Sequence, residues 1–179
     1  EFFKAFALAM LTRHQDVAPF LVLEITEAVA TQDIFMTRQF AMAAHKIGAR
    51  VALDDFGSGY SNFSSLATMP ASFLKIDGRF VRSLREDGNG LSIVRTISLL
   101  AHELQMACIA EWVEDLETLR MLRAVGIDHA QGHVVAAPVR LDVLTQWLEE
   151  PERLVSGPVR DALGEPVEPD LASMNSLAR

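Results

Sequence analysis

Cysteines, basic clusters and long apolar runs are scarce or missing in this 179-residue sequence. With one cysteine, Cys108, an internal disulfide is impossible, and its apolar neighbours Met106 to Ala110 predict a buried thiol in a reducing compartment. A formal net charge of -8 without a basic cluster argues against an unaided grip on a nucleic acid polymer or an anionic membrane. A phosphate-bearing ligand would therefore need metal ions as intermediaries. Because no apolar run can span a bilayer, we expect a cytoplasmic domain without membrane contact of its own, whether or not it is tethered to a membrane protein.

Half of the residues are apolar, which suffices for one domain with a sizeable core. We assign residues 1–150 to this domain. Apolar residues already recur at helical spacing from Phe2 to Met10, so we expect whatever precedes Glu1 to belong to the same fold. From about Gly157 the sequence is rich in proline, glycine, serine and acids without periodicity, and residues 151–179 are therefore predicted to be a tail or linker.

Buried strands and amphipathic helices alternate along the domain. The predicted strands are 21–25, 51–55, 73–77, 106–110 and 131–135. The first predicted helix after the opening one spans about 33–46, with Met36, Phe40, Ala43 and Ile47 on one face and Gly48 as its stop. A short helix is predicted at Phe63 and Leu66. Three more are predicted from the cap Asn89 to Leu104, from the cap Asp115 to Gly126, and at 143–148. Such alternation favours right-handed parallel βαβ units, arranged either as a doubly wound open sheet or as a (β/α)8 TIM-like barrel.

Charged or polar residues stand at the end of almost every predicted strand. They are Glu24, Glu27, Asp54, Asp55, Lys75, Asp77, Glu111, Glu114 and Gln131. An open sheet would draw a site from a few strand ends, whereas a barrel gathers residues from nearly all of them, so this pattern favours a barrel that is incomplete at the N-terminus, with about three strands upstream. For any one residue, the alternative is that its charge merely solvates the rim.

The sharpest signal is the run from Val51 to Tyr60, an apolar strand that leads into Asp54 and Asp55 and a glycine-rich turn. Adjacent carboxylates at the end of a buried strand are costly unless a cation or protons neutralise them. Carboxylates bind hard divalent cations, which hold phosphate oxygens and acidify a water molecule, and the neighbouring Lys75 would orient that water. These residues predict a two-metal phosphoryl site.

The chain resembles the EAL domain family, the cyclic di-GMP phosphodiesterases of bacteria. The resemblance extends from about Glu1 to Leu148 and depends on five ordered motifs: Glu24-Ile25-Thr26-Glu27, Asp54-Asp55-Phe56-Gly57-Ser58-Gly59-Tyr60-Ser61, Leu74-Lys75-Ile76-Asp77, Ala110-Glu111-Trp112-Val113-Glu114 and Gln131-Gly132. It implies a barrel that uses two Mg²⁺ or Mn²⁺ ions to cleave cyclic di-GMP to linear pGpG, a homodimer, and fusion to sensory or cyclase modules.

The resemblance also implies a role for each matching residue. Glu24, Asp54, Asp55 and Glu111 would be metal ligands, with Glu111, Lys75 and Asp55 in the catalytic centre. Glu27 would steady the loop after the Asp-Asp pair. Asp77, Gln131, Glu114, Phe56 and Gly57 would contact the substrate, and the loop Phe56 to Ser65 would couple substrate, metals and dimerisation.

Some positions depart from the family pattern. The Glu-Ala-Leu motif and an early asparagine ligand do not occur in this chain, Trp112 replaces a usual glycine, and His133 replaces a common tyrosine. We therefore carry two hypotheses. The first is a cyclic-guanylate-specific phosphodiesterase, and the second is a degenerate EAL domain that binds cyclic di-GMP without cutting it or acts through protein contacts.

Overall fold

A computed structural model of the chain describes residues 2–59, 66–85, 88–150 and 155–164. Its centre is a five-stranded, entirely parallel sheet in the order β1-β2-β3-β4-β5. The strands are β1 (Val22–Thr26), β2 (Arg50–Phe56), β3 (Phe73–Ile76), β4 (Ala107–Ala110) and β5 (His129–Ala130). Neighbours in the sheet are also consecutive in the chain, which is the strand order of a (β/α)8 barrel.

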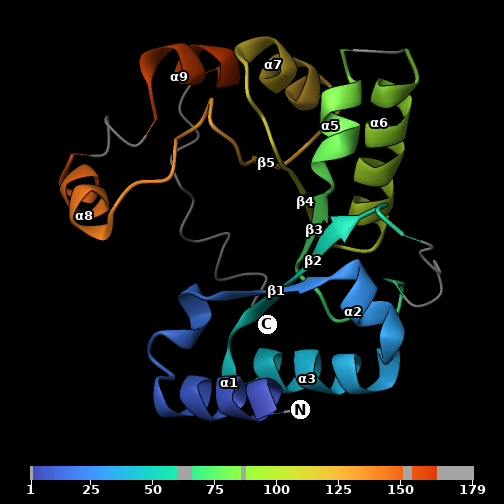
Figure 1. Cartoon of the computed structure of the whole chain (residues 1–179), viewed down its shortest axis with the longest axis vertical. Coiled ribbons are helices and arrows are strands. Elements are labelled where there is room, and N and C mark those ends of the chain that lie inside the picture. Colours follow the sequence, from blue (N-terminus) through green and yellow to red (C-terminus); the bar gives the residue numbers. More distant parts are fainter. Residues whose placement is uncertain (1, 60–65, 86–87, 151–154, 165–179) are drawn as a thin grey trace.

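The helices between the strands lie along the outer side of the sheet (Figure 1), and further helices precede the first strand or follow the last. They are α1 (Phe2–Arg13), the 3-10 turn η1 (Ala18–Phe20), α2 (Glu27–Gln32), α3 (Ile34–Ile47), α5 (Gly78–Ser83), α6 (Gly88–Glu103), α7 (Leu116–Ala124), α8 (Leu141–Glu149) and α9 (Gly157–Leu163). Helix α3 packs on β2, and α6 packs on β3 and β4. No described helix is both long enough and apolar enough to cross a membrane.

Local side chains fix where several helices begin and end. Asp33 accepts a hydrogen bond from the Met36 amide at 3.0 Å, and Asp115 accepts one from the Thr118 amide at 2.8 Å. Gly48 ends α3 with a φ of 107°, a left-handed conformation that glycine adopts without steric cost. The predicted cap Asp115 and the predicted stop Gly48 are confirmed.

Three sequence predictions are wrong in detail. Asn89 lies inside α6, which starts at Gly88, so it is not the N-cap. The last strand is His129–Ala130 rather than 131–135, because the chain turns at Gly132, whose missing Cβ allows close approach to the Val113 backbone. In α3 the buried residues are Thr37, Phe40, Ala41 and Ala44, so Phe40 is buried as predicted, whereas the other predicted residues Met36, Ala43 and Ile47 are only half-buried.

The predicted tail is also partly helical. Residues Gly157–Leu163 form α9, which packs on α7 and buries Val159 and Ala162 to 1% and 5% exposure. The segment is too short for periodicity to reveal it. Pro158 lies in its first turn, a position that favours proline, whereas proline in the sequence alone is typical of a tail or linker. The short helix predicted at Phe63 falls outside the described residues, although Leu66 at its end is buried.

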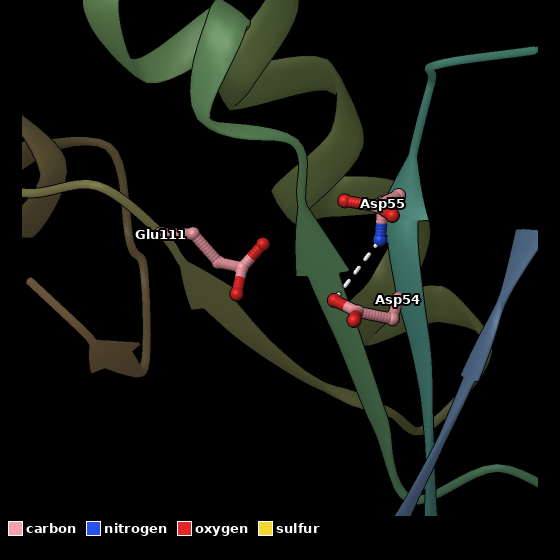
Figure 2. Close-up of side chains that lie close together, drawn as sticks. All are labelled: Asp54, Asp55 and Glu111. Carbon is pink, nitrogen blue, oxygen red and sulfur yellow. Dashed lines mark hydrogen bonds between the residues drawn. The ribbon is translucent and has the colours of Figure 1, made fainter.

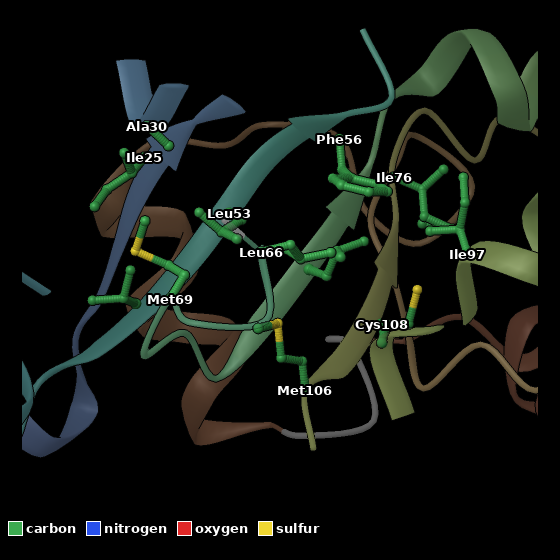
Figure 3. Packing of buried hydrophobic residues seen from close by; sticks show 14 of the residues in the cluster. Ile25, Ala30, Leu53, Phe56, Leu66, Met69, Ile76, Ile97, Met106 and Cys108 are labelled. Carbon is green, nitrogen blue, oxygen red and sulfur yellow. The ribbon is translucent and has the colours of Figure 1, made fainter. Parts of the chain in front are cut away.

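The main core fills the space between the sheet and the outer helices (Figure 3). Leu74 and Ile76 of β3 are fully buried, and so are Val94 of α6 and Cys108 of β4. Side chains alternate between the two faces of a strand, so with Leu74 and Ile76 facing the helices, Lys75 faces the opposite, inner side of the sheet. The apolar packing thereby fixes the direction of a buried ammonium group.

Candidate active site

The two adjacent carboxylates of β2 reach one place because the strand carries a bulge. Leu53 pairs with Leu74 and Phe56 pairs with Ile76, so β2 has one residue more than β3 between these pairs. Asp54 and Asp55 thus stand opposite Lys75 alone. On a regular strand they would point to opposite faces, but the bulge and the φ of 56° at Asp55 redirect the backbone. The Asp55 amide donates to the Asp54 carboxylate at 3.0 Å, which fixes their relative position.

Lys75 connects carboxylates from three other parts of the sheet. Its Nζ lies 2.9 Å from Glu24 Oε1, 2.9 Å from Asp54 Oδ1 and 2.8 Å from Glu111 Oε1. Lys75 is 2% exposed, so these three hydrogen bonds satisfy the three protons of an ammonium group that has almost no contact with water. The predicted residues of β1, β2, β3 and the end of β4 therefore meet in one cluster.

Electrostatics within this cluster oppose one another. Burial by itself would lower the pKa of Lys75, but its hydrogen bonds to Glu111, Asp54 and Glu24 raise that pKa above the ordinary lysine value. Burial raises the pKa of Glu111 against the opposing effect of Lys75, and burial together with the charges of Asp54 and Asp77 raises the pKa of Asp55. The cluster contains more carboxylates than ammonium groups, so its net charge is negative. This negative charge attracts a further cation.

Three of the acids are arranged as ligands for such a cation. Asp54, Asp55 and Glu111 each offer a carboxylate oxygen, and these oxygens lie within 4.8 Å of one another. Figure 2 shows Glu111 directed across β3 toward the aspartate pair on β2. An all-oxygen, all-carboxylate set suits hard ions such as Mg²⁺ and Mn²⁺. The residues present therefore fit the predicted metals, with Glu24 joined to the set through Lys75.

Glu27 supports the loop that follows the aspartate pair. It is 7% exposed and its Oε2 accepts a hydrogen bond from the Gly57 amide at 2.8 Å. Gly57 has a φ of 91°, and a Cβ atom at this position would overlap the Phe80 ring. Both the conformation and the close approach thus require glycine there. The remainder of the predicted loop, residues 60–65, lies outside the described residues.

Asp77 has a local role at the start of α5. Its carboxylate accepts a hydrogen bond from the Arg79 amide at 2.8 Å and forms an ion pair with the Arg79 guanidinium at 2.9 Å. Burial would raise the pKa of Asp77, but the hydrogen bonds and charge of Arg79 lower it overall. Sequence reasoning missed Arg79, although a basic residue two positions after a strand-end acid was a visible signal.

The other predicted substrate residues lie differently. Phe56 is 7% exposed and belongs to the core (Figure 3), so its side chain serves packing and leaves only its backbone for a ligand. Glu114 and Gln131 are exposed just beyond β4 and β5. The Gln131 backbone accepts from the Val113 amide at 3.1 Å, which ties the two strand ends together.

The family model for the EAL domain matches residues 1–138. The chain belongs to the EAL domain family. EAL domains have a TIM-like barrel, which confirms the predicted fold class, and this EAL chain contributes five parallel strands to it. A Pseudomonas aeruginosa protein named as a cyclic di-GMP phosphodiesterase is 34% identical over 128 residues, a match that covers 72% of this chain and 22% of the relative.

Solved structures of EAL proteins resemble this one. The PaMucR phosphodiesterase in complex with c-di-GMP has a TM-score of 0.71 and 33% identity, over 75% of this chain and 54% of that one. Klebsiella pneumoniae BlrP1, in a manganese and cy-diGMP complex, has a TM-score of 0.60 and 31% identity, over 64% of this chain and 29% of that one. A calcium complex of BlrP1 also matches. The chain spans about a fifth of the length of the P. aeruginosa cyclic di-GMP phosphodiesterase that it matches.

Proposed function

We propose that the EAL domain to which this chain belongs hydrolyses cyclic di-GMP to linear pGpG at a two-metal phosphodiesterase site. The observation that carries the proposal is the convergence of Asp54, Asp55 and Glu111 around buried Lys75. Phosphoryl transfer depends on placing cations and an oriented water molecule around a phosphate group, and this cluster supplies the carboxylates and the positioned ammonium group that such chemistry needs. The naming of its relatives as cyclic di-GMP phosphodiesterases supports the same reaction.

The residues of the cluster would bind the metal ions, orient the attacking water and accept its proton. Two Mg²⁺ or Mn²⁺ ions would be held by Glu24, Asp54, Asp55 and Glu111. Such ions would lower the pKa of a bound water molecule and stabilise negative charge on the phosphate oxygens. Lys75 would orient the attacking water with a proton that becomes free when one of its ion pairs, at 2.8 to 2.9 Å, opens. Glu111, whose pKa burial raises, is placed to accept a proton from that water.

The residues around the cluster position the substrate. Asp77, beside the aspartate pair, and Glu114 and Gln131 at the neighbouring strand ends would contact the nucleotide. Gly57 and Phe56 would contribute backbone contacts alone, because the Phe80 ring lies where a Gly57 side chain would be and the Phe56 side chain is buried. Glu27 holds this loop through its bond to the Gly57 amide at 2.8 Å.

A second candidate is a receptor that binds cyclic di-GMP without cleaving it. The observation in its favour is that Lys75 already pairs with Glu24, Asp54 and Glu111, three of the four proposed ligands, at 2.8 to 2.9 Å. A bound metal would compete with the ammonium group for these carboxylates, whereas a receptor would leave the ion pairs in place.

The two candidates separate in one assay on the full-length protein. It is incubated with cyclic di-GMP and Mg²⁺ or Mn²⁺, and the products are resolved by chromatography. Formation of pGpG that disappears in Glu111→Ala and Lys75→Ala supports the phosphodiesterase, and Ca²⁺ should inhibit because its coordination is looser. Tight binding without pGpG would favour the receptor, and unchanged hydrolysis in both variants would contradict the roles assigned to these residues.

We also propose that the domain acts as a homodimer within a longer signalling protein that carries sensory or cyclase modules. The small share of the relatives' length that this chain covers, 22% in the P. aeruginosa protein, supports the longer protein. The homodimer is expected from the resemblance to the EAL family. Light scattering on the full-length protein tests the dimer directly, and a strictly monomeric mass would contradict it.

A further inference from the structure

Trp112 has a backbone conformation that is unfavourable for its side chain. Its φ is 56°, in the left-handed region that glycine adopts freely and that is strained for a bulky residue. The neighbouring backbone enforces this conformation. Val113 is fully buried, its amide donates to the Gln131 carbonyl at 3.1 Å, and its carbonyl accepts from the Val134 amide at 3.1 Å. A glycine would fit without strain, so the presence of tryptophan indicates a use for its indole ring.

Helix α5 supports one face of that ring. A Cβ atom at Gly78 would overlap the indole, which shows that the ring lies directly on the backbone of the first turn. The Arg82 guanidinium lies 3.8 Å from the ring centre, in cation–π contact. Gly78 and Arg82 are four positions apart and so share one face of α5, on which the indole is supported from one side.

The indole is not enclosed on all sides, and its neighbours in the chain belong to the site. Trp112 is 52% exposed, so part of its indole remains open to a ligand. It directly follows Glu111, and Gly78, on which it rests, directly follows Asp77. Trp112 therefore belongs to the strand ends that carry the site, and its contacts with Gly78 and Arg82 hold the ring in place before any ligand arrives.

We infer that the open face of Trp112 is a stacking platform for one purine base of the cyclic dinucleotide. This inference rests on the proposed function, and it adds a residue that positions the base while the acids engage the phosphates. A planar base can stack on an indole whatever its hydrogen-bonding edge, and such stacking contributes about 1–3 kcal/mol per base. The support from α5 lowers the conformational cost of binding, because the ring is already held in place.

The test measures binding of cyclic di-GMP to the full-length protein by titration calorimetry, with Ca²⁺ in place of Mg²⁺ to limit cleavage. Trp112→Leu keeps an apolar side chain without an aromatic face, and it should weaken binding about 5- to 150-fold, the equivalent of the stacking range. Trp112→Phe should stay within about 3-fold of the unaltered protein, since a phenyl ring still stacks. The matched control Trp147→Leu removes an indole from α8 and should leave affinity unchanged.

Thermal melts of each variant check its folding. If Trp112→Leu does not fold, Arg82→Ala replaces it, because Arg82 is exposed and its loss frees the indole; a 2- to 5-fold weaker affinity is then expected. Equal affinity of Trp112→Leu and the unaltered protein would overturn the platform while leaving the phosphodiesterase intact, and so would equal affinity of Arg82→Ala where that variant is used. Failure of the unaltered protein to bind cyclic di-GMP would instead contradict the proposed function and with it this ligand.

Discussion

At the scale of single residues, Lys75 sets the charge balance of the site. It is 2% exposed and bonded to Glu24, Asp54 and Glu111, so its ammonium group is the buried counter-charge to three carboxylates. Removing one partner of a buried ion network leaves the other charges uncompensated, which costs more than the network itself contributes. Lys75 therefore stabilises the metal-free site as well as serving the proposed reaction.

Lys75→Met is expected to lower the free energy of unfolding in EDTA by about 3–5 kcal/mol, because three carboxylates lose their buried partner. Added Mn²⁺ should reduce this deficit by supplying positive charge to the same oxygens. Urea unfolding of the full-length protein followed by circular dichroism measures both effects. The control is Lys46→Met on the exposed face of α3, and an equally small loss in both variants in EDTA would contradict the assigned role.

Cys108 should be chemically inert in the folded protein. Burial, together with the charge of Asp128, raises the pKa of its thiol to about 12. At pH 8 this lowers the reactive thiolate fraction by about three orders of magnitude, and the fraction recovers only as pH rises toward that pKa. Labelling with a thiol reagent at pH 8 should be slow in the native protein and fast in guanidinium chloride. Rapid native labelling at Cys108, mapped by mass spectrometry, would show that the residue is accessible.

At the scale of elements, the end of β2 decides the geometry of the site. The bulge places Asp54 and Asp55 together, and the chain then turns at Gly57, whose amide donates a hydrogen bond to the Glu27 carboxylate. Each of these features needs a backbone conformation that a regular strand does not have. The arrangement depends on Phe80 as well, because its ring occupies the space beside Gly57 that a side chain would need.

Comparing Gly57→Ala with Gly126→Ala separates the cost of a positive φ from the cost of a steric overlap between the new Cβ atom and a neighbouring side chain. Both glycines have a positive φ, 91° and 83°, so both substitutions carry the conformational cost of about 1 kcal/mol. At Gly126 a Cβ has room, with the nearest atom, Ser98 Oγ, at 3.9 Å, whereas at Gly57 it would overlap the Phe80 ring. Gly57→Ala should therefore destabilise by about 1–3 kcal/mol more than Gly126→Ala in chemical denaturation.

A double variant tests the cause of that difference. Phe80→Ala removes the ring that the new Cβ meets, so Gly57→Ala should cost less in the Phe80→Ala background than in the unaltered protein. Additive losses in the double variant would show that the clash is not what makes Gly57 necessary.

At the scale of the whole molecule, the sheet is an arc of five parallel strands with helices along its outer side (Figure 1). The carboxyl ends of all strands lie at one edge, which brings residues 24, 54, 75 and 111 together despite their separation in the chain. Helix α9 completes the outer layer by packing on α7. Residues beyond the matched family segment 1–138 thus contribute to the core of this chain.

Val159→Ala tests whether α9 is part of that core. Val159 is 1% exposed, so deleting its methyl groups should destabilise the full-length protein by about 2 kcal/mol. Val139→Ala is the control, because Val139 is 40% exposed and should cost less than about 0.5 kcal/mol. Urea titrations compare the two, and indistinguishable midpoints would mean that α9 does not contribute to stability.

Much of the fold follows from the sequence alone. The alternation of apolar strands with amphipathic helices predicted parallel βαβ units. The strand-end charges, such as Glu24, Lys75 and Glu111, favoured the barrel over an open sheet and predicted the elements that supply the candidate site. Asp115 and Gly48 marked helix ends correctly because capping is a local interaction between neighbours in the chain. These features are short-range, and so a linear reading finds them.

The tertiary structure decided what depends on distant neighbours. The bulge that aligns Asp54 with Asp55 is a relation between β2 and β3, and the buried contacts of α9 depend on α7. The support of Trp112 by Gly78 and Arg82 likewise joins the end of β4 to α5. In each case the decisive energy comes from packing and hydrogen bonds between segments far apart in the sequence, and no local propensity records it.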